Sequence, residues 1–69
     1  MMDKTIKEIA DGAIRRINKS LEQGTLDEAW DYVTDYHNAE RPIIQTYGQA
    51  EYDKLLDKVK KAIDMDWNL

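Results

Sequence analysis

The sequence predicts an all-α protein, a small antiparallel three-helix bundle with one short helical turn. Three long segments repeat apolar residues at helical spacing, no segment alternates apolar and polar residues as a strand does, and the connections between segments are short. We expect helices over about residues 4–22, 25–40 and 49–64 and a helical turn over about 42–47, all within a single domain of residues 1–69.

The first segment, residues 4–22, places its apolar residues on one helical face. This stripe consists of Ile6, Ile9, Ala10, Ala13, Ile14, Ile17 and Leu21. Asp3 is a candidate N-cap, and Gly24 is suited to end the helix in the left-handed conformation. Gly12 lies on the polar side and disfavours the helix by about 1 kcal/mol relative to alanine. Because the apolar phase is the same before and after Gly12, we expect no break there.

The second segment opens with T-L-D-E at residues 25–28, a pattern typical of a capping box. In such a box the Thr25 hydroxyl accepts the backbone N–H of Glu28, and the Glu28 side chain reaches back. One face of this segment carries Leu26, Ala29, Trp30, Val33 and His37. We therefore expect Trp30 in the core and His37 on the core side, near the end of the helix.

Proline punctuates the chain once, at Pro42. It disfavours helical geometry at Arg41, which predicts that the second helix ends near residue 39 or 40. The short turn over 42–47 then starts with proline at its first position. Either Gly48 ends this turn, or Thr46 caps the last helix with Gln49 at the third position.

The last segment, residues 49–64, shows a third apolar stripe. It consists of Tyr52, Leu55, Leu56, Val59, Ala62 and Ile63, and Trp67 continues its phase. Outside the stripe, Glu51 with Lys54 and Asp57 with Lys61 have the spacing of ion pairs along a helix.

Composition narrows the possible functions. The chain has 14 acidic and 10 basic residues and a net charge of −4, which argues against a nucleic-acid binder. With no cysteine and one histidine, we expect no disulfide, no metal site and no other cofactor. No apolar run approaches the ~20 residues that span a bilayer, and residues 1–4 show no secretion signal. We therefore expect a cytoplasmic protein that does not bind membranes.

We predict that the protein is not an enzyme, because no phosphate-binding loop, nucleophile elbow or zinc-protease motif is present. Nothing places Ser20, the only serine, beside His37. His37 could be a metal ligand or a general base near Asp35 and Glu40. We favour a structural histidine at a helix end, because one histidine without carboxylates clustered on its own face is a poor metal site.

An acidic stripe marks the second helix, opposite its apolar face. It consists of Asp27, Glu28, Asp31 and Asp35. Tyr32 and Tyr36 stand four residues apart beside it and would form a tyrosine ridge, and tyrosine is common at interfaces. We predict that the ridge, together with Asp27, Asp31 and Asp35, binds a partner. The alternatives are a solvated acidic face and rings that lap over the edge of the bundle.

Trp67 and the first segment raise the question of self-association. Trp67 either caps the bundle or is an exposed anchor for a partner, and we include it in the predicted partner-binding set. The apolar stripe from Ile6 to Leu21 is about 23 Å long, and the second helix and the turn do not cover all of it. Basic residues of the first segment could also pair with the acidic stripe of another subunit. We therefore expect a homodimer or a higher oligomer.

These features favour a non-enzymatic interaction module: a small acidic regulator or inhibitor that binds and blocks a larger protein. Inhibitors encoded by viruses or mobile elements have a similar composition. One alternative is an oligomer that binds or sequesters a nucleotide or metabolite where subunits meet, with His37, Arg41 and Tyr47 as candidate ligand-binding residues. Another is a structural oligomerisation domain.

Overall fold

The computed structural model describes the backbone of residues 5–67 and the side chains of residues 5–65. These residues form α1 (Ile6–Gln23), α2 (Leu26–Val33), a π-helical turn η1 (Tyr36–Glu40), α3 (Arg41–Tyr47) and α4 (Gln49–Trp67). No described residue lies in a strand, so the all-α prediction is confirmed. The prediction of three helices is wrong, because the segment expected as one helix over 25–40 is divided and the turn over 42–47 is part of a separate helix.

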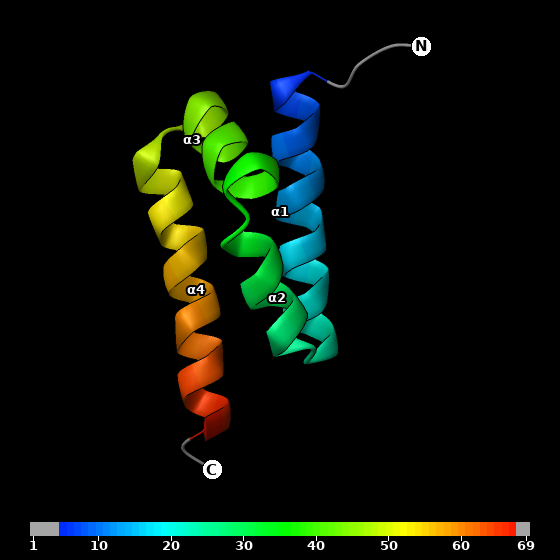
Figure 1. Cartoon of the computed structure of the whole chain (residues 1–69). Helices are drawn as coiled ribbons and strands as arrows, with labels where there is room; N and C mark the ends of the chain where they lie inside the picture. Colours follow the sequence, from blue (N-terminus) through cyan, green and yellow to red (C-terminus); the bar gives the residue numbers. More distant parts are fainter. Residues whose placement is uncertain (1–4, 68–69) are drawn as a thin grey trace.

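Two long helices frame the molecule, and the shorter elements run between them. Figure 1 shows α1 and α4 as the outer rods, with α2, η1 and α3 connecting one to the other. Both α2 and α3 pack against α1 and against α4. Among the described residues, no helix combines the length and the apolar character that crossing a membrane requires.

The ends of α1 follow local chemistry. Thr5 is the N-cap, and its side chain accepts the backbone N–H of Glu8 at 3.1 Å. The helix therefore begins later than expected, and the predicted cap Asp3 lies outside the described residues. Gly24 ends the helix with φ 78°, as predicted. The helix continues through Gly12, which confirms that this glycine causes no break.

The predicted capping box at the start of α2 is wrong. Thr25 makes no side-chain cap bond to α2. Instead its backbone N–H and its hydroxyl both donate to the carbonyl of Ser20, at 2.9 and 3.2 Å. Together with the Gly24 N–H, which donates to Leu21, these bonds close the C-terminus of α1 in a Schellman arrangement. The Thr25 side chain is thus directed back to α1, and its oxygen accepts no hydrogen bond from the first turn of α2.

The break after α2 comes from side chains that compete with the helix for backbone groups. The Thr34 hydroxyl donates to the carbonyl of Trp30 at 2.7 Å. The Asp35 carboxylate accepts the backbone N–H and the side-chain amide of Asn38, both at 3.1 Å, and so caps η1. Thr34 thus stabilises the end of α2, and Asp35 stabilises the start of η1. The apolar periodicity does not reveal either interaction.

The helical element before α3 ends at Glu40, within the predicted range, but the predicted effect of Pro42 on Arg41 is wrong. Arg41 has φ −61° and ψ −50°, which is ordinary helical geometry, although Pro42 follows it. Pro42 lies in the first turn of α3, as expected, where its missing N–H has no intrahelical partner to lose. Gly48 ends α3 with φ 98°, which decides between the two alternatives for this junction.

Asp35 gives a first testable prediction. Hydrogen bonds from the side chain and backbone of Asn38 hold the pKa of this carboxyl below its ordinary value. Stabilisation by Asp35 is therefore present above the unfolded pKa of about 3.9 and lost as the pH falls through the lower folded pKa. We expect Asp35→Ala to melt at a lower temperature than the wild type at pH 7, with the difference shrinking on acidification.

Asp35→Asn is the matched control for that experiment, because asparagine retains an acceptor oxygen and caps helices well. It should recover most of the loss at pH 7 and remove the acid dependence. Equal melting temperatures for Asp35→Ala and the wild type, measured by circular dichroism, would show that the cap does not hold η1.

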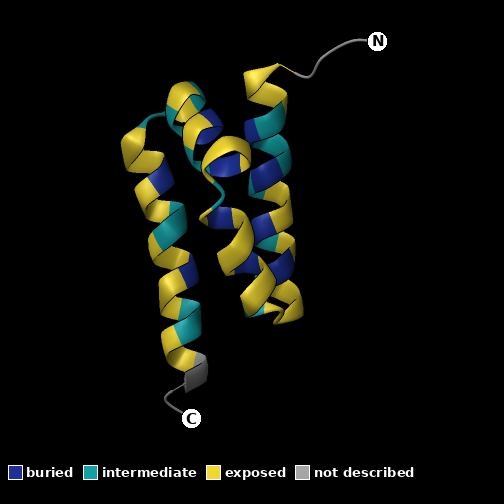
Figure 2. Cartoon of the chain, viewed as in Figure 1, coloured by how far each residue is buried: buried dark blue, intermediate teal, exposed yellow. Residues whose placement is uncertain are grey.

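The core is narrow and rich in alanine (Figure 2). Its buried apolar residues, in addition to Pro42, are Ala10, Ala13, Ile17, Ala29, Val33, Ala39, Ile43, Tyr52 and Val59. Trp30 is 39% exposed, so its predicted place in the core is wrong. The reason is that α2 buries its narrow Ala29 and Val33 side, and the large indole ring next to that side lies at the edge of the helix.

The long helix α4 has the ion pairs expected of it. Lys54 contacts Glu51 at 3.3 Å and Lys61 contacts Asp57 at 2.9 Å, both on the exposed side. The helix extends to Trp67, three residues past the predicted end. The Trp67 side chain lies outside the described residues, so the structure does not place this predicted partner-binding group.

Candidate functional site

The solvent-facing side of α2 is the first candidate surface. Ala29 and Val33 face the core, and we name the remaining exposed side the α2 face. The α2 face consists of Asp27, Glu28, Trp30, Asp31 and Tyr32, all of them exposed. Successive residues are rotated by about 100° in an α-helix, which sets the three carboxylates between the two aromatic rings. The resulting surface is acidic in the middle and apolar at both edges.

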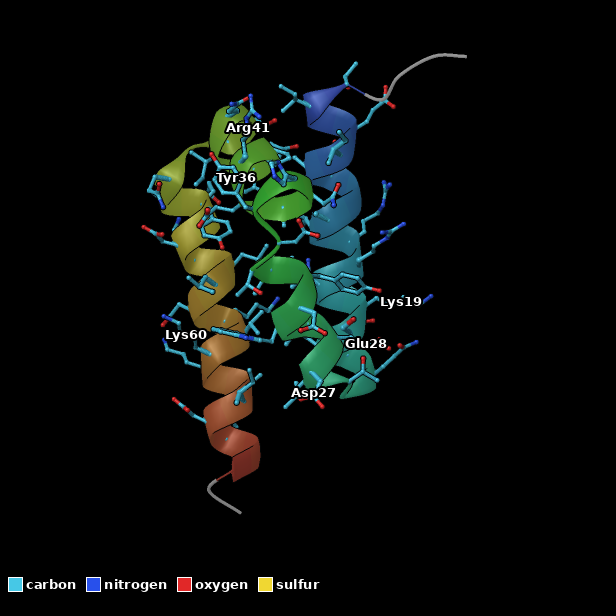
Figure 3. The ribbon with its side chains drawn as sticks, in the orientation of Figure 1. Lys19, Asp27, Glu28, Tyr36, Arg41 and Lys60 are labelled. Carbon is cyan, nitrogen blue, oxygen red and sulfur yellow. The ribbon has the colours of Figure 1, made fainter. Side chains whose placement is uncertain are left out.

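The carboxylates of the α2 face are available to a partner. Within residues 5–65, none of the three forms an ion pair. Figure 3 shows Asp27 and Glu28 near the start of α2, with Lys19 of α1 and Lys60 of α4 on either side. The face is thus a local acidic strip between basic side chains, which favours a partner whose own charge is similarly localised.

The predicted tyrosine ridge does not form, because the helix breaks between its two members. Tyr32 belongs to α2 and Tyr36 to η1. Tyr36 is 55% exposed, and its ring meets His37 edge-on with centroids 5.2 Å apart. Figure 3 places Tyr36 near Arg41, at the opposite end of the molecule from Asp27. Each tyrosine remains a partner-binding prediction, but the two belong to different surfaces.

Asp35 also separates from the acidic stripe. It lies after the end of α2, half-buried, and its carboxylate is occupied by Asn38. The structure gives Asp35 a capping role in η1, and its predicted contact with a partner stays a prediction. The free acidic surface is therefore confined to the first two turns of α2.

The residues predicted to hold a small ligand are only partly brought together. His37 and Arg41 line a shallow pocket of about 260 Å³ between α1 and α3. Tyr47 lines a different depression with Ile14 and Leu55, and its hydroxyl donates to Asp11. This bond raises the pKa of Tyr47 and lowers that of Asp11. The three residues predicted to bind a small ligand therefore do not share one pocket, because His37 and Arg41 line one and Tyr47 lines another.

His37 is exposed, so its predicted place on the core side is wrong. The prediction assumed one continuous helix from Trp30 to His37. The break at Thr34 and Asp35 changes the direction in which residues after it face, so His37 no longer shares a side with Val33. In the part of the chain that the structure describes, no three His, Asp or Glu side chains gather closely enough to hold a metal ion.

Sequence reasoning missed several residues that line the cavities. Gly12 and Arg16 of α1 lie with Tyr32 and Asn38 around a pocket of about 300 Å³. Neither Arg16 nor Asn38 is among the site residues predicted from the sequence. The sequence feature that could have indicated this pocket is Gly12, because a glycine inside a strongly periodic helix is unfavourable and suggests a packing or functional role.

Comparison of the chain with protein families, with curated proteins and with solved structures finds no match. The function proposed below therefore rests on the surfaces of this molecule.

Proposed function

We propose that this protein is a non-enzymatic interaction module, a small acidic regulator that binds and blocks a larger protein through the α2 face. The observation that carries the proposal is the exposure of Trp30 and Tyr32 on either side of three unpaired carboxylates. Aromatic side chains supply most of the affinity at protein interfaces, because they bury a large area with few rotatable bonds.

The packing of α2 supports this proposal, because the side of the helix opposite the α2 face is buried against other helices. Ala29 and Val33 are fully buried, and the helix packs on both α1 and α4. A surface held in one conformation loses little conformational entropy on binding, which favours affinity. The α2 face would thus present its rings and carboxylates in a fixed arrangement.

The partner that fits this face is a protein with an apolar pocket beside basic residues. Exposed carboxylates accelerate encounter with a basic surface, and this effect weakens as salt is added. The aromatic rings would act after encounter, by filling the partner's pocket and slowing dissociation. The two kinds of side chain therefore predict separate kinetic effects.

The proposal is tested by capturing partners from the host's native extract with the wild type and with a Trp30→Ala/Tyr32→Ala variant, and then measuring the affinity of any purified partner. We expect the variant to bind about 700-fold more weakly, the combined effect of two truncated anchors of about 2 kcal/mol each. Asp27→Asn/Asp31→Asn should mainly slow association, and its effect should diminish in high salt.

Met65→Ala with Asp64→Asn is the control, because it removes an exposed apolar side chain and a negative charge from α4 rather than from the α2 face. It should leave binding unchanged. A partner that binds the Trp30→Ala/Tyr32→Ala variant as tightly as the wild type would exclude the α2 face as the site, provided that both proteins melt at similar temperatures.

A second copy of the chain is the other occupant to test, since we also propose self-association. Light scattering over a range of concentrations distinguishes the two cases. If the wild type forms dimers and the Trp30→Ala/Tyr32→Ala variant is monomeric, the α2 face joins subunits. If the wild type remains a monomer at all concentrations, the homodimer proposal fails and the partner proposal is unaffected.

A further inference from the structure

A groove runs along the other side of Tyr32, between α1 and the segment from α2 to α3. Two pockets of about 300 and 260 Å³ lie there, and they share Ile9 as a lining residue. We name this feature the α1 groove. It extends along α1 from Ile6 to Arg16, a distance of about 15 Å at the helical rise. Its size falls within the range of sites that hold small molecules.

Gly12 keeps the wall of this groove open. The residue lies in the middle of α1, where glycine disfavours the helix, and beyond its adjacent residues and the nearby backbone of α1 a Cβ placed on it would meet no atom within 4 Å. Neither close packing nor a positive φ explains a glycine at this position. What the missing side chain does provide is space in the groove, directly opposite the tyrosine side of α2.

Two arginines lie along the groove. Arg16 lines the first pocket, and Arg41 and His37 line the second. Neither arginine pairs with a carboxylate within residues 5–65. Asp35 is the one acidic residue that lines either pocket, and its two oxygens already accept hydrogen bonds from Asn38. An overall acidic protein thus has a local site with free cationic groups.

The π-helical turn is what brings these groups together. The Glu40 N–H donates to Asp35 and the Arg41 N–H to Tyr36, each five residues back. This wider turn, which is frequent at functional sites, leads directly into α3. Asn38 then lines the first pocket, and His37 and Arg41 line the second.

We propose that the α1 groove binds a small organic phosphate with a planar ring, of the size of a nucleoside monophosphate. The ring lies over Gly12 beside Tyr32, and the phosphate binds the guanidinium of Arg41 or Arg16. Arginine suits this role because its planar donors match phosphate oxygens in pairs. The site is independent of the partner proposed for the α2 face, apart from Tyr32, which borders both.

The proposal is tested by titrating ¹⁵N-labelled protein with the four ribonucleoside 5′-monophosphates, inorganic phosphate and adenosine, followed by amide chemical shifts. We expect saturable shifts at Ile9 to Arg16 and at Asn38 to Arg41 with at least one nucleotide. Inorganic phosphate and adenosine should each bind more weakly than that nucleotide, because each offers only half of the contacts. If phosphate alone binds as tightly, the ring contributes nothing and the proposed ligand class is wrong.

Four variants make the experiment more specific. Arg41→Gln and Arg16→Gln remove cations from the groove, and at least one should weaken binding about tenfold. Arg15→Gln is the matched control, because Arg15 is an exposed neighbour on α1 that does not line either pocket. Gly12→Met fills the groove without removing a polar group. It should abolish binding without lowering the melting temperature, since methionine favours a helix more than glycine does.

Two outcomes would overturn the proposal. One is the absence of localised, saturable shifts with every probe at millimolar concentration. The other is an equal loss of binding in Arg15→Gln and in the groove variants, which would indicate general attraction of anions rather than a site. Neither outcome bears on the α2 face, because the binding test there uses protein partners and different substitutions.

Discussion

Replacing Ile17 by alanine is expected to lower the free energy of unfolding by about 2–5 kcal/mol. Ile17 is fully buried in the middle of α1 and, among residues 5–65, is one of four large side chains that are almost completely enclosed. The truncation removes apolar contacts and leaves a cavity that alanine-rich neighbours cannot fill by rearranging. A domain of this length has a total stability of roughly 3–10 kcal/mol, so the variant should be partly or wholly unfolded at 37 °C.

Ile6→Ala is the matched control for this prediction, because it makes the same chemical change in the same helix. Ile6 is 46% exposed, so its truncation should change stability by no more than about 0.5 kcal/mol. Urea unfolding monitored by circular dichroism measures both variants. Similar losses at the two positions would show that α1 packs in a different rotation.

Replacing Tyr52 by phenylalanine is expected to destabilise the protein by about 1–3 kcal/mol. The Tyr52 side chain is 3% exposed, and its hydroxyl donates to the carbonyl of Val33 at 2.7 Å. Val33 is the last residue of α2, where helix carbonyls lack intrahelical partners. Phenylalanine keeps the ring packing and leaves that carbonyl unpaired in the interior. Hydrogen exchange at Thr34 to Arg41 should become faster, because the bond joins α4 to the start of the break.

The pH dependence of stability provides a second test of the Tyr52 hydrogen bond. Burial raises the pKa of the Tyr52 hydroxyl above its ordinary value, and the charge of Glu40 adds to the effect. Stabilisation by the protonated hydroxyl is therefore complete below about pH 10 and is lost as the pH rises through the higher folded pKa. The difference between the wild type and Tyr52→Phe should shrink over this range.

Tyr47→Phe is the control, because Tyr47 is 42% exposed and its hydroxyl contacts Asp11 at the surface. Its removal should change stability little, since exposed polar contacts are replaced by water. If Tyr47→Phe lowered the free energy of unfolding more than Tyr52→Phe, the hydrogen bond between α3 and α1 would contribute more to stability than the one between α4 and α2.

Both candidate surfaces depend on the end of α2. If the helix continued past Val33, Tyr32 and Tyr36 would share one side, and His37 would turn toward the core. The break instead leaves Tyr32 between the α2 face and the α1 groove and directs His37 and Arg41 to the groove. The hydroxyl of Tyr52 and the carboxylate of Asp35 therefore support the backbone arrangement on which both candidate surfaces depend.

The sequence by itself determined the features that depend on neighbours along the chain. These include the all-α class, the continuity of α1 through Gly12, the left-handed end at Gly24 and the two ion pairs on α4. Each of them depends on apolar periodicity, on backbone freedom or on side chains three or four residues apart. Such interactions can be read directly from the order of residues.

Only the tertiary structure decided the division of the segment 25–40, the exposure of Trp30 and the grouping of His37 with Arg41. At Thr25 and Asp35, local hydrogen bonds compete with the helix, and the sequence pattern does not show which of them forms. The hydroxyl that satisfies the end of α2 comes from Tyr52, 19 residues away from Val33. The groove likewise exists because α1 and η1 lie side by side, and the small side of α2 turns Trp30 outward because Ala29 and Val33 fit between two other helices.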